Sequence, residues 1–438
     1  MTLVEFVPPT PHPLWKLCPQ MGITDVIVKV NPDLTGLADP WRYETLSSIV
    51  SRLKSAGLNV VGLEGDPFDM TPIKEYGAGK FLTGFTRFTG LKEVGAMSPD
   101  PDNPVNSVNP VKEDSATLRE EALSHYRELL ESMGRLGIKL LCYNFMVGKG
   151  WSRTGVREGR GGAKATYFSL DGFLTGFTRF TGLKELGAMP PDPDNLVNPV
   201  NPVGKQNLII SHEQVWANYE YFIKAVMPTA EKCGVRMALH PDDPCLDSLG
   251  GYARIFGSIE AYDRAYAIYP SPSNAVTFCQ ANFKLMLGNG PLTGFTRFTG
   301  LHELGAEPPD PDNPVNPVNP VQTLEDAARH FGKRIAFIHV RDVEGTKEDF
   351  TELFHDQGNT DQFALMRTYR ELGLDVPVRG DHVPEMAYDR VLTPEGTPGY
   401  FTLGRLFANG YLKALLQGTG NVSSATTFGE ATVVKKNA

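Results

Sequence analysis

Short apolar segments alternate with amphipathic ones along most of the chain. In the apolar segments, β-branched and aromatic residues are frequent and the length suits a buried strand. These segments are Leu3–Phe6, Ile23–Val30, Leu58–Glu64, Ile138–Phe145, Val235–His240, Ala275–Gln280, Arg334–Asp342 and Val376–Asp381. Between them, apolar residues recur at helical spacing. The clearest such segments are Trp41–Ala56, Ala116–Leu136, Glu213–Cys233, Ile259–Tyr269, Leu324–Phe331 and Asp361–Leu372.

Helix boundaries agree with this pattern. Ser115 stands where a residue that caps a helix start is expected, and Gly57, Gly137 and Gly234 stand where helices end. Strands that alternate with helices predict parallel β/α units. Eight such units predict a closed (β/α)8 TIM barrel. The alternative is an open doubly wound sheet, but no GxGxxG phosphate turn follows the first strands.

A 30-residue sequence close to LTGFTRFTGLKELGAMPPDPDNPVNPVNPV occurs three times, at 82–111, 174–203 and 292–321. The copies follow the third, fourth and sixth predicted strands, so we expect three long insertions in βα loops. They are not adjacent, which argues against a solenoid, because solenoid repeats bury a core shared with their neighbours. Proline fixes φ and lacks an N–H, so the proline-rich halves are expected to be extended or disordered.

The copies have two explanations. The Thr-Gly-Phe start of each copy is, at the codon level, nearly the reverse complement of its Asn-Pro-Val end, which indicates an inverted-repeat genetic element inserted in frame. The alternative is a binding motif copied for valency. Without these blocks, 348 of the 438 residues remain. We expect one catalytic domain at 1–418, interrupted by the three inserts, and a flexible tail at 419–438.

Composition narrows the class of protein. A hydrophobic fraction of 41% supports a sizeable core, and a net charge of −9 without a basic cluster argues against nucleic-acid binding. No apolar run approaches the ~18 residues of a membrane span, and no secretory leader is seen. Five widely spaced cysteines fit a reduced compartment. We therefore expect a cytoplasmic protein with a small-molecule partner, no nucleic acid and no membrane; a homo-oligomer stays open.

Metal-ligand side chains stand at four predicted strand ends. They are His240 in ALHPDDP, Cys279 in VTFCQAN, His339 in FIHVRD and Asp381 in VRGDH. The carboxyl ends of barrel strands converge on one axis, so residues far apart in sequence can share one ion. Imidazole, thiolate and carboxylate together suit a divalent transition ion such as Mn²⁺, Fe²⁺ or Zn²⁺. The alternative is that each is an ordinary core or rim residue.

The chain also resembles the mannonate dehydratase family, metal-dependent lyases with a xylose-isomerase-like barrel. The matching strings, in order, are CYNF at Cys142–Phe145, WSRT at Trp151–Thr154, HPDDP at His240–Pro244, FIHVR at Phe337–Arg341, RGDH at Arg379–His382, and PGY at Pro398–Tyr400. The resemblance implies that His240, Cys279, His339 and Asp381 bind Mn²⁺ or Fe²⁺. It also implies a hydro-lyase that converts D-mannonate to 2-keto-3-deoxy-D-gluconate in glucuronate catabolism.

Such a dehydration needs two proton transfers. A base removes the proton next to the carboxylate, and an acid assists the leaving hydroxyl. His382, beside Asp381, is the first acid/base candidate, and Tyr400 is the second.

Substrate binding has four candidates. Arg153 and Arg341 are predicted to hold the substrate carboxylate through bidentate contacts, with a structural ion pair as the alternative. Asn144 and Glu64, both at strand ends, are candidates for binding sugar hydroxyls. The Asp242–Asp243 pair is expected to cap the turn after its strand.

Two other functions compete with the lyase. One is a sugar isomerase or epimerase on the same barrel. Such sites usually use Glu, Asp and His ligands, so a cysteine ligand at Cys279 counts against this function. A catalytically impaired relative, obstructed by its inserts, is the other.

Overall fold

The computed structural model describes residues 1–78, 115–148, 150–174, 208–288 and 321–420. Within them, parallel strands form a closed ring, and every one of the apolar segments that the sequence singled out overlaps one of these strands. The N-terminal strand is divided at Val4 into β1, which pairs with β15, and β2, which pairs with β3. In ring order the strands are β1 (Thr2–Leu3), β15 (Pro377–Gly380), β12 (Ile335–Val340), β11 (Asn274–Cys279), β8 (Arg236–Leu239), β5 (Leu140–Tyr143), β4 (Asn59–Glu64), β3 (Asp25–Lys29) and β2 (Glu5–Val7).

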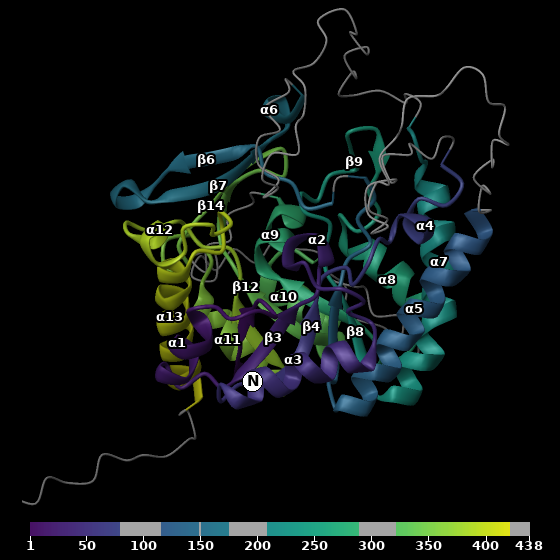
Figure 1. Cartoon of the computed structure of the whole chain (residues 1–438). Helices are drawn as coiled ribbons and strands as arrows, with labels where there is room; N and C mark the ends of the chain where they lie inside the picture. Colours follow the sequence, from purple (N-terminus) through teal and green to yellow (C-terminus); the bar gives the residue numbers. More distant parts are fainter. Residues whose placement is uncertain (79–114, 149, 175–207, 289–320, 421–438) are drawn as a thin grey trace, which may run out of the picture.

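Helices lie between successive strands along the chain, except between the two halves of the N-terminal strand, and cover the outside of the ring (Figure 1). All six predicted helices are confirmed: α3 (Tyr43–Ser55), α5 (Ser115–Leu136), α7 (His212–Cys233), α8 (Ile259–Ile268), α10 (Leu324–Phe331) and α11 (Gln362–Glu371). Gly57, Gly137 and Gly234 have positive φ directly after their helices, as expected. Ser115 is the first residue of α5, not the residue before it.

Two outer helices were not predicted, α1 (Leu14–Gln20) and α13 (Thr402–Gly420). α1 is short and contains Pro19. α13 contains glycines, which lower helix propensity. One of them is needed, because a Cβ on Gly404 would lie 2.5 Å from the Pro384 carbonyl oxygen. Tertiary packing of a buried face outweighs local propensity in both.

The barrel has an inner and an outer core, and the strand period of two sorts residues between them. Ile27 of β3 packs inside the barrel with Val4, Phe6 and Phe337. Its neighbour Val28 packs outward in the larger layer between strands and helices. Lys29, the last residue of β3, therefore returns to the inner side at the carboxyl end of the barrel.

A small antiparallel sheet extends above this end of the barrel (Figure 1). Its order is β13 (Val343–Gly345), β14 (Asp349–Glu352), β7 (Lys164–Ser169) and β6 (Gly155–Glu158). It joins the segment after β5 to the segment after β12. Sequence reading missed it because the strands are short and largely polar. The remaining elements are the β9 (Ser248–Leu249) and β10 (Tyr252–Ala253) hairpin, 3-10 turns at Arg160–Gly162 and Gly332–Arg334, and the short helices α2 (Pro32–Thr35), α4 (Thr71–Lys74), α6 (Leu170–Leu174), α9 (Gln280–Leu287) and α12 (Asp389–Leu392).

The repeats fall almost entirely outside the described residues. Their described flanks lie between β4 and α5, between β5 and α7, and between β11 and α10, which are βα connections. The predicted tail begins two residues too early, since α13 continues to Gly420, and 421–438 lie outside the described part. No helix in the described ranges has the length and apolar character needed to cross a membrane.

Candidate active site

Four neighbouring strands of the ring bring the predicted metal ligands together. His240 follows β8, Cys279 ends β11, His339 lies in β12 and Asp381 follows β15. Cys279 and His339 are direct register partners on adjacent strands. One ligand atom from each of the four residues lies within 4.8 Å of those from the other three. The convergence expected from barrel geometry is therefore present.

The electrostatics of these side chains suit a cation. His240 Nδ1 donates a hydrogen bond to the Pro241 carbonyl oxygen at 2.8 Å, which leaves Nε2 with a free lone pair. Both ring nitrogens of His339 are buried and have no hydrogen-bond partner within the described chain. Burial alone would raise the pKa of the Cys279 thiol, but His240, His339 and Arg341 together lower it to about 6. A thiolate, the form that binds metals, is thus favoured near neutral pH.

A second set of ligand atoms, from Glu64, Cys142 and His339, shares one histidine with the first. It is the poorer site on chemical grounds. Arg379 holds the Glu64 carboxylate with two hydrogen bonds, at 2.7 and 3.2 Å. Burial, with the Glu64 charge, raises the pKa of the Cys142 thiol, so this sulfur stays protonated. One ion at the four-residue set is the better interpretation.

The two arginines predicted to hold substrate lie in a buried ion-pair cluster. Arg153 donates to both carboxylate oxygens of Asp243, at 2.7 and 2.9 Å, and to Glu352 at 2.6 Å. Arg341 donates to both oxygens of Glu352, at 2.7 Å each, and to Asp243 at 2.8 Å. The side chains of all four residues are at most 1% exposed. Their mutual neutralisation matches the structural ion pair that the sequence left as the alternative.

Burial and charge oppose each other in this cluster, and charge prevails. Burial raises the pKa of Glu352, but Arg341, Arg153 and His382 lower it to about 2. Burial likewise raises the pKa of Asp243, but the charges of Arg153 and Arg341 outweigh it and hold that pKa below its usual range. Both carboxylates are therefore ionised at neutral pH.

His382 lies between this cluster and Tyr400. Its Nδ1 is 3.0 Å from Glu352 Oε1, and its Nε2 is 2.9 Å from the Tyr400 hydroxyl. A carboxylate can only accept, so Nδ1 carries a proton and the carboxylate fixes which ring nitrogen is protonated. His382 Nε2 also lies 3.8 Å from Asp381 Oδ1. The acid/base candidates thus adjoin the ligand set.

The two candidates for binding sugar hydroxyls are already engaged in part. Asn144 Oδ1 accepts hydrogen bonds from Lys74 Nζ and the Met146 amide, both at 3.1 Å. Glu64 pairs with Arg379 as described. Their role toward substrate stays a prediction.

Sequence reasoning missed two parts of the site. Glu352 ends β14, and nothing in its DFTE segment marks it, because the small sheet that positions it was not predicted. Asp242 and Asp243 were read as turn caps, and this was wrong. Asp242 Oδ2 accepts from the Phe256 amide at 2.8 Å, and Asp243 binds the arginines. The adjacent carboxylates directly after a strand were the signal available.

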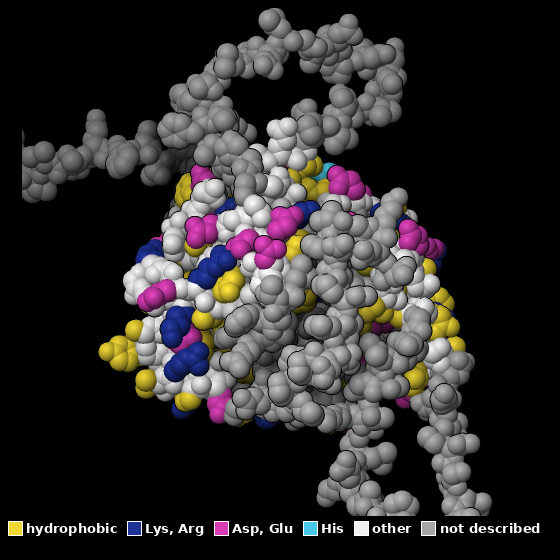
Figure 2. Space-filling model, turned by 90° about the horizontal axis from the view of Figure 1, so that it is seen from above, with side chains coloured by type: hydrophobic (Ala, Val, Ile, Leu, Met, Phe, Trp, Pro, Cys, Tyr) yellow, Lys and Arg dark blue, Asp and Glu magenta, His cyan; other side chains and the backbone are white. Residues whose placement is uncertain are grey.

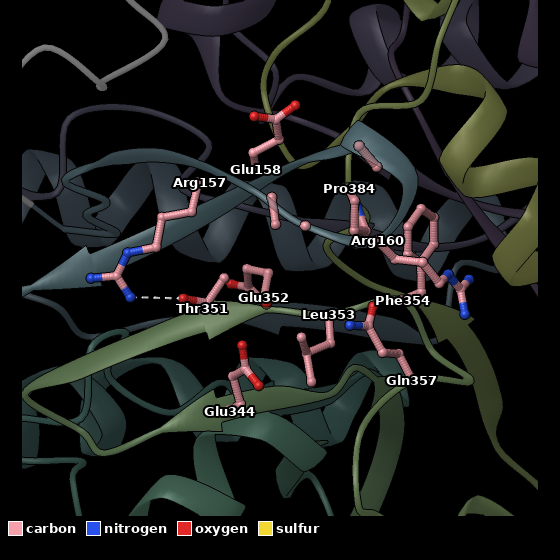
Figure 3. Close-up of a pocket in the computed structure, with 13 residues that line it drawn as sticks. Arg157, Glu158, Arg160, Glu344, Thr351, Glu352, Leu353, Phe354, Gln357 and Pro384 are labelled. Carbon is pink, nitrogen blue, oxygen red and sulfur yellow. Dashed lines mark hydrogen bonds between the residues drawn. The ribbon is translucent and has the colours of Figure 1, made fainter.

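A cavity of about 170 Å³ lies beside Glu352, between the β6–β7 segment and β14. Figure 3 shows Glu352 next to Thr351, whose hydroxyl accepts a hydrogen bond from Arg157 at 2.8 Å. None of the four strand-end ligands lines this cavity. Figure 2 looks onto the same end of the molecule, where Lys and Arg side chains alternate with Asp and Glu over the described surface. The chemistry of the site therefore rests on the strand-end residues.

A family model described as D-mannonate dehydratase (UxuA) matches residues 102–298 and 315–426, more than half of the chain. The chain belongs to the D-mannonate dehydratase family. All the site residues predicted from sequence except Glu64 fall inside the matched ranges.

Individual relatives agree with this family. The mannonate dehydratase of Streptococcus equi subsp. zooepidemicus is 29% identical over 319 residues, covering 69% of this chain and 74% of its own. The mannonate dehydratase of Brachyspira hyodysenteriae is 25% identical over 404 residues, covering 90% and 91%. The crystal structure of mannonate dehydratase from Streptococcus suis serotype 2 superposes with a TM-score of 0.64 at 21% identity, covering 97% of each chain. This structural likeness supports the barrel fold.

Proposed function

We propose that this protein is a metal-dependent hydro-lyase that converts D-mannonate to 2-keto-3-deoxy-D-gluconate in hexuronate breakdown. The observation that carries the proposal is the convergence of His240, Cys279, His339 and Asp381 within 4.8 Å, beside the hydrogen-bonded His382–Tyr400 pair. It occurs in a chain of the D-mannonate dehydratase family. A cytoplasmic location, and the absence of nucleic-acid and membrane partners, belong to the same proposal.

The donor set fits a divalent transition ion, for which we propose Mn²⁺ or Fe²⁺. It combines two imidazoles, a thiolate and a carboxylate, and both nitrogens of buried His339 lack a hydrogen-bond partner within the described residues. When bound, such an ion supplies Lewis acidity, which stabilises negative charge on a substrate oxygen. Histidine and cysteine must lose protons to bind it, and the neighbours of Cys279 favour that loss.

We assign the proton transfers to His382 and Tyr400. With a proton held on Nδ1 by Glu352, the Nε2 atom of His382 is the acceptor for the hydrogen on the carbon next to the carboxylate. Burial, with the Asp381 charge, raises the pKa of Tyr400 well above its usual value, so its phenol keeps a proton to donate to the leaving hydroxyl. The C2–H electron pair forms the C2–C3 double bond as the C3–O bond breaks. Water leaves, and the enol rearranges to the 2-keto product.

The deciding experiment is turnover by the purified chain. D-mannonate is incubated with the protein loaded with Mn²⁺ or Fe²⁺, and the 2-keto-3-deoxy acid is detected; a His240→Ala variant, lacking one proposed ligand, is the control. We expect product with the wild type and almost none with the variant. No product from a metal-loaded, folded wild type contradicts the proposal and favours the impaired relative. Isomerised or epimerised sugar instead of a keto acid favours the isomerase, against which Cys279 already counts.

A further inference from the structure

Lys29 places a positive charge at the mouth of the barrel, on the side opposite the ligand-bearing strands. It is the last residue of β3 and the direct register partner of Glu64 on β4. The alternation that sends Ile27 inward sends Lys29 inward as well. Its ammonium lies 5.7 Å from the centroid of the Tyr400 ring and 5.9 Å from that of Phe6. It is therefore a neighbour of the proposed proton donor.

This ammonium has no hydrogen bond or ion pair with any residue that the structure describes. The nearby carboxylates are committed to other cations. Glu64 binds Arg379 with two hydrogen bonds, and Glu5 binds Arg405 and Asn409. Two aromatic faces lie near the charge, and the Glu64 carboxylate acts on it at longer range. The aromatic faces offer modest stabilisation compared with a directly bound anion. Lys29 is partly buried, and no carboxylate of the described residues lies within ion-pair distance of its ammonium, so an anionic ligand at this position would be favourable.

The two arginines that the sequence proposed for the substrate carboxylate are already saturated. All five N–H donors of Arg153 are taken by Asp243, Glu352 and the Ser152 carbonyl oxygen. Arg341 gives four hydrogen bonds to Glu352, Asp243 and Asn282. Releasing either arginine to bind substrate would leave buried carboxylates unpaired, which is strongly unfavourable. Apart from the proposed metal ion, a cation other than these two arginines would therefore have to meet the substrate carboxylate.

We propose that Lys29 binds the carboxylate of the substrate. The inference rests on the proposed function in one respect, that the substrate is a sugar acid. The position suits the reaction, because the carbon that loses its proton is bonded directly to the carboxylate. An anchor beside Tyr400 holds that carbon next to the His382–Tyr400 pair. Lys29 would also make the site selective for sugar acids over neutral sugars of the same length, since a neutral sugar leaves the Lys29 charge unpaired.

Steady-state kinetics test the role. Lys29→Met removes the charge and keeps the length, Lys29→Arg keeps the charge, and Lys54→Met is the control, since Lys54 is exposed on α3. We expect Lys29→Met to raise KM for D-mannonate about 10- to 100-fold, the usual value of a charge-assisted contact, with a smaller change in kcat. Lys29→Arg should recover most of the loss, and Lys54→Met should show none. A collapse of kcat with unchanged KM overturns the proposal and indicates proton transfer.

Binding of unreactive ligands separates this proposal from the proposed function. D-gluconate carries a carboxylate and D-mannitol does not, and binding of both is measured by calorimetry on metal-loaded protein. Lys29→Met should weaken gluconate at least tenfold and leave mannitol unchanged. If the wild type turns over D-mannonate and both proteins bind gluconate equally, the Lys29 proposal alone fails. If the wild type shows no turnover but binds gluconate through Lys29, the proposed function alone fails.

Stability supplies an independent readout. Burial, with the Arg405 charge, lowers the pKa of Lys29 from 10.5 to about 8. The folded state therefore opposes protonation, and this cost is complete below pH 8 and gone above about 10.5. Lys29→Met should melt at a higher temperature than the wild type at pH 7, with the difference shrinking as pH rises to 10.5. A variant that is less stable at pH 7 indicates a structural lysine and overturns the proposal.

Discussion

The two histidines His240 and His382 differ in what their ring nitrogens contact. His240 and His382 each use Nδ1 for a partner within the protein, a backbone carbonyl for the first and a carboxylate for the second. Each therefore presents Nε2 to the mouth of the barrel. His240 Nε2 is available as a ligand, whereas His382 Nε2 meets the Tyr400 hydroxyl. The different hydrogen-bond partners therefore suit the two histidines to two different proposed roles.

Cys279→Ala tests the ligand set. Removing the only sulfur among the four groups should sharply reduce bound Mn²⁺ or Fe²⁺, while circular dichroism shows an intact barrel. Cys233→Ala, at a half-buried position on α7, is the matched control and should keep its metal. Metal analysis that finds equal content in the two variants would exclude Cys279 as a ligand.

His382→Asn tests the proton-transfer assignment. The variant should keep its metal and much of its substrate affinity but lose about 10²- to 10⁴-fold in kcat, the usual contribution of a general acid or base. The measurement is kcat on protein whose metal content has been verified. Near-normal turnover in that protein would remove His382 from the mechanism.

Among the elements, the small β6–β7–β14–β13 sheet matters most for the site. It is built from segments after β5 and after β12, and it carries Glu352 down to the barrel mouth. There Glu352 joins Arg153, Arg341 and His382 through hydrogen bonds. At its outer edge the sheet is held by Arg157 and Asp349, whose side chains are 40% and 50% exposed. Because the Glu352 contacts are buried and the Arg157–Asp349 pair is exposed, we expect the two to contribute very unequally to the free energy of unfolding.

Glu352→Gln and Arg157→Ala compare the two attachments. Glu352→Gln removes a negative charge from beside two buried arginines and should lower the free energy of unfolding by about 3–5 kcal/mol. Arg157→Ala removes an exposed pair and should cost about 1 kcal/mol or less. Denaturant titration measures both; similar losses would contradict the inequality.

The Glu352 effect should also depend on pH. Despite burial, the arginines lower the pKa of Glu352 from 4.5 to about 2. Its stabilisation is therefore complete above pH 4.5 and is lost as pH falls towards 2. The difference between wild type and Glu352→Gln should shrink over that interval.

At the scale of the whole molecule, the barrel closes around its ring although three βα connections contain the repeated sequence. β1 pairs with β15 and β2 with β3, so the N-terminal strand completes the ring. Lengthening a flexible loop adds little closure cost, about 0.6 kcal/mol for each doubling. A barrel can therefore accept long insertions whose ends stay close. We retain the interpretation of a single catalytic domain interrupted by inserts as a proposal.

Deleting 82–111, 174–203 and 292–321 together should leave a folded, metal-binding barrel. Turnover of D-mannonate should equal or exceed that of the full chain, because the insertions lie in connections at the catalytic end. Thermal melting, metal content and kcat of the 348-residue protein are measured beside the full chain. Failure to fold, or lost activity with metal retained, would show that the repeats have become part of the structure or the site, as copies kept for binding would.

The sequence by itself determined the barrel strands, six of its outer helices and the four strand ends that carry the candidate metal ligands. These features are local, because apolar periodicity defines each element and a polar residue marks where a buried strand ends. Only the tertiary structure decided what each charge binds. Glu352 lies 199 residues from Arg153, and their ion pair depends on a small sheet with no clear local signal. Arg153 and Arg341 therefore pair with protein carboxylates, whereas Lys29 has no ion pair among the described residues, because proximity in the fold decides which charges pair.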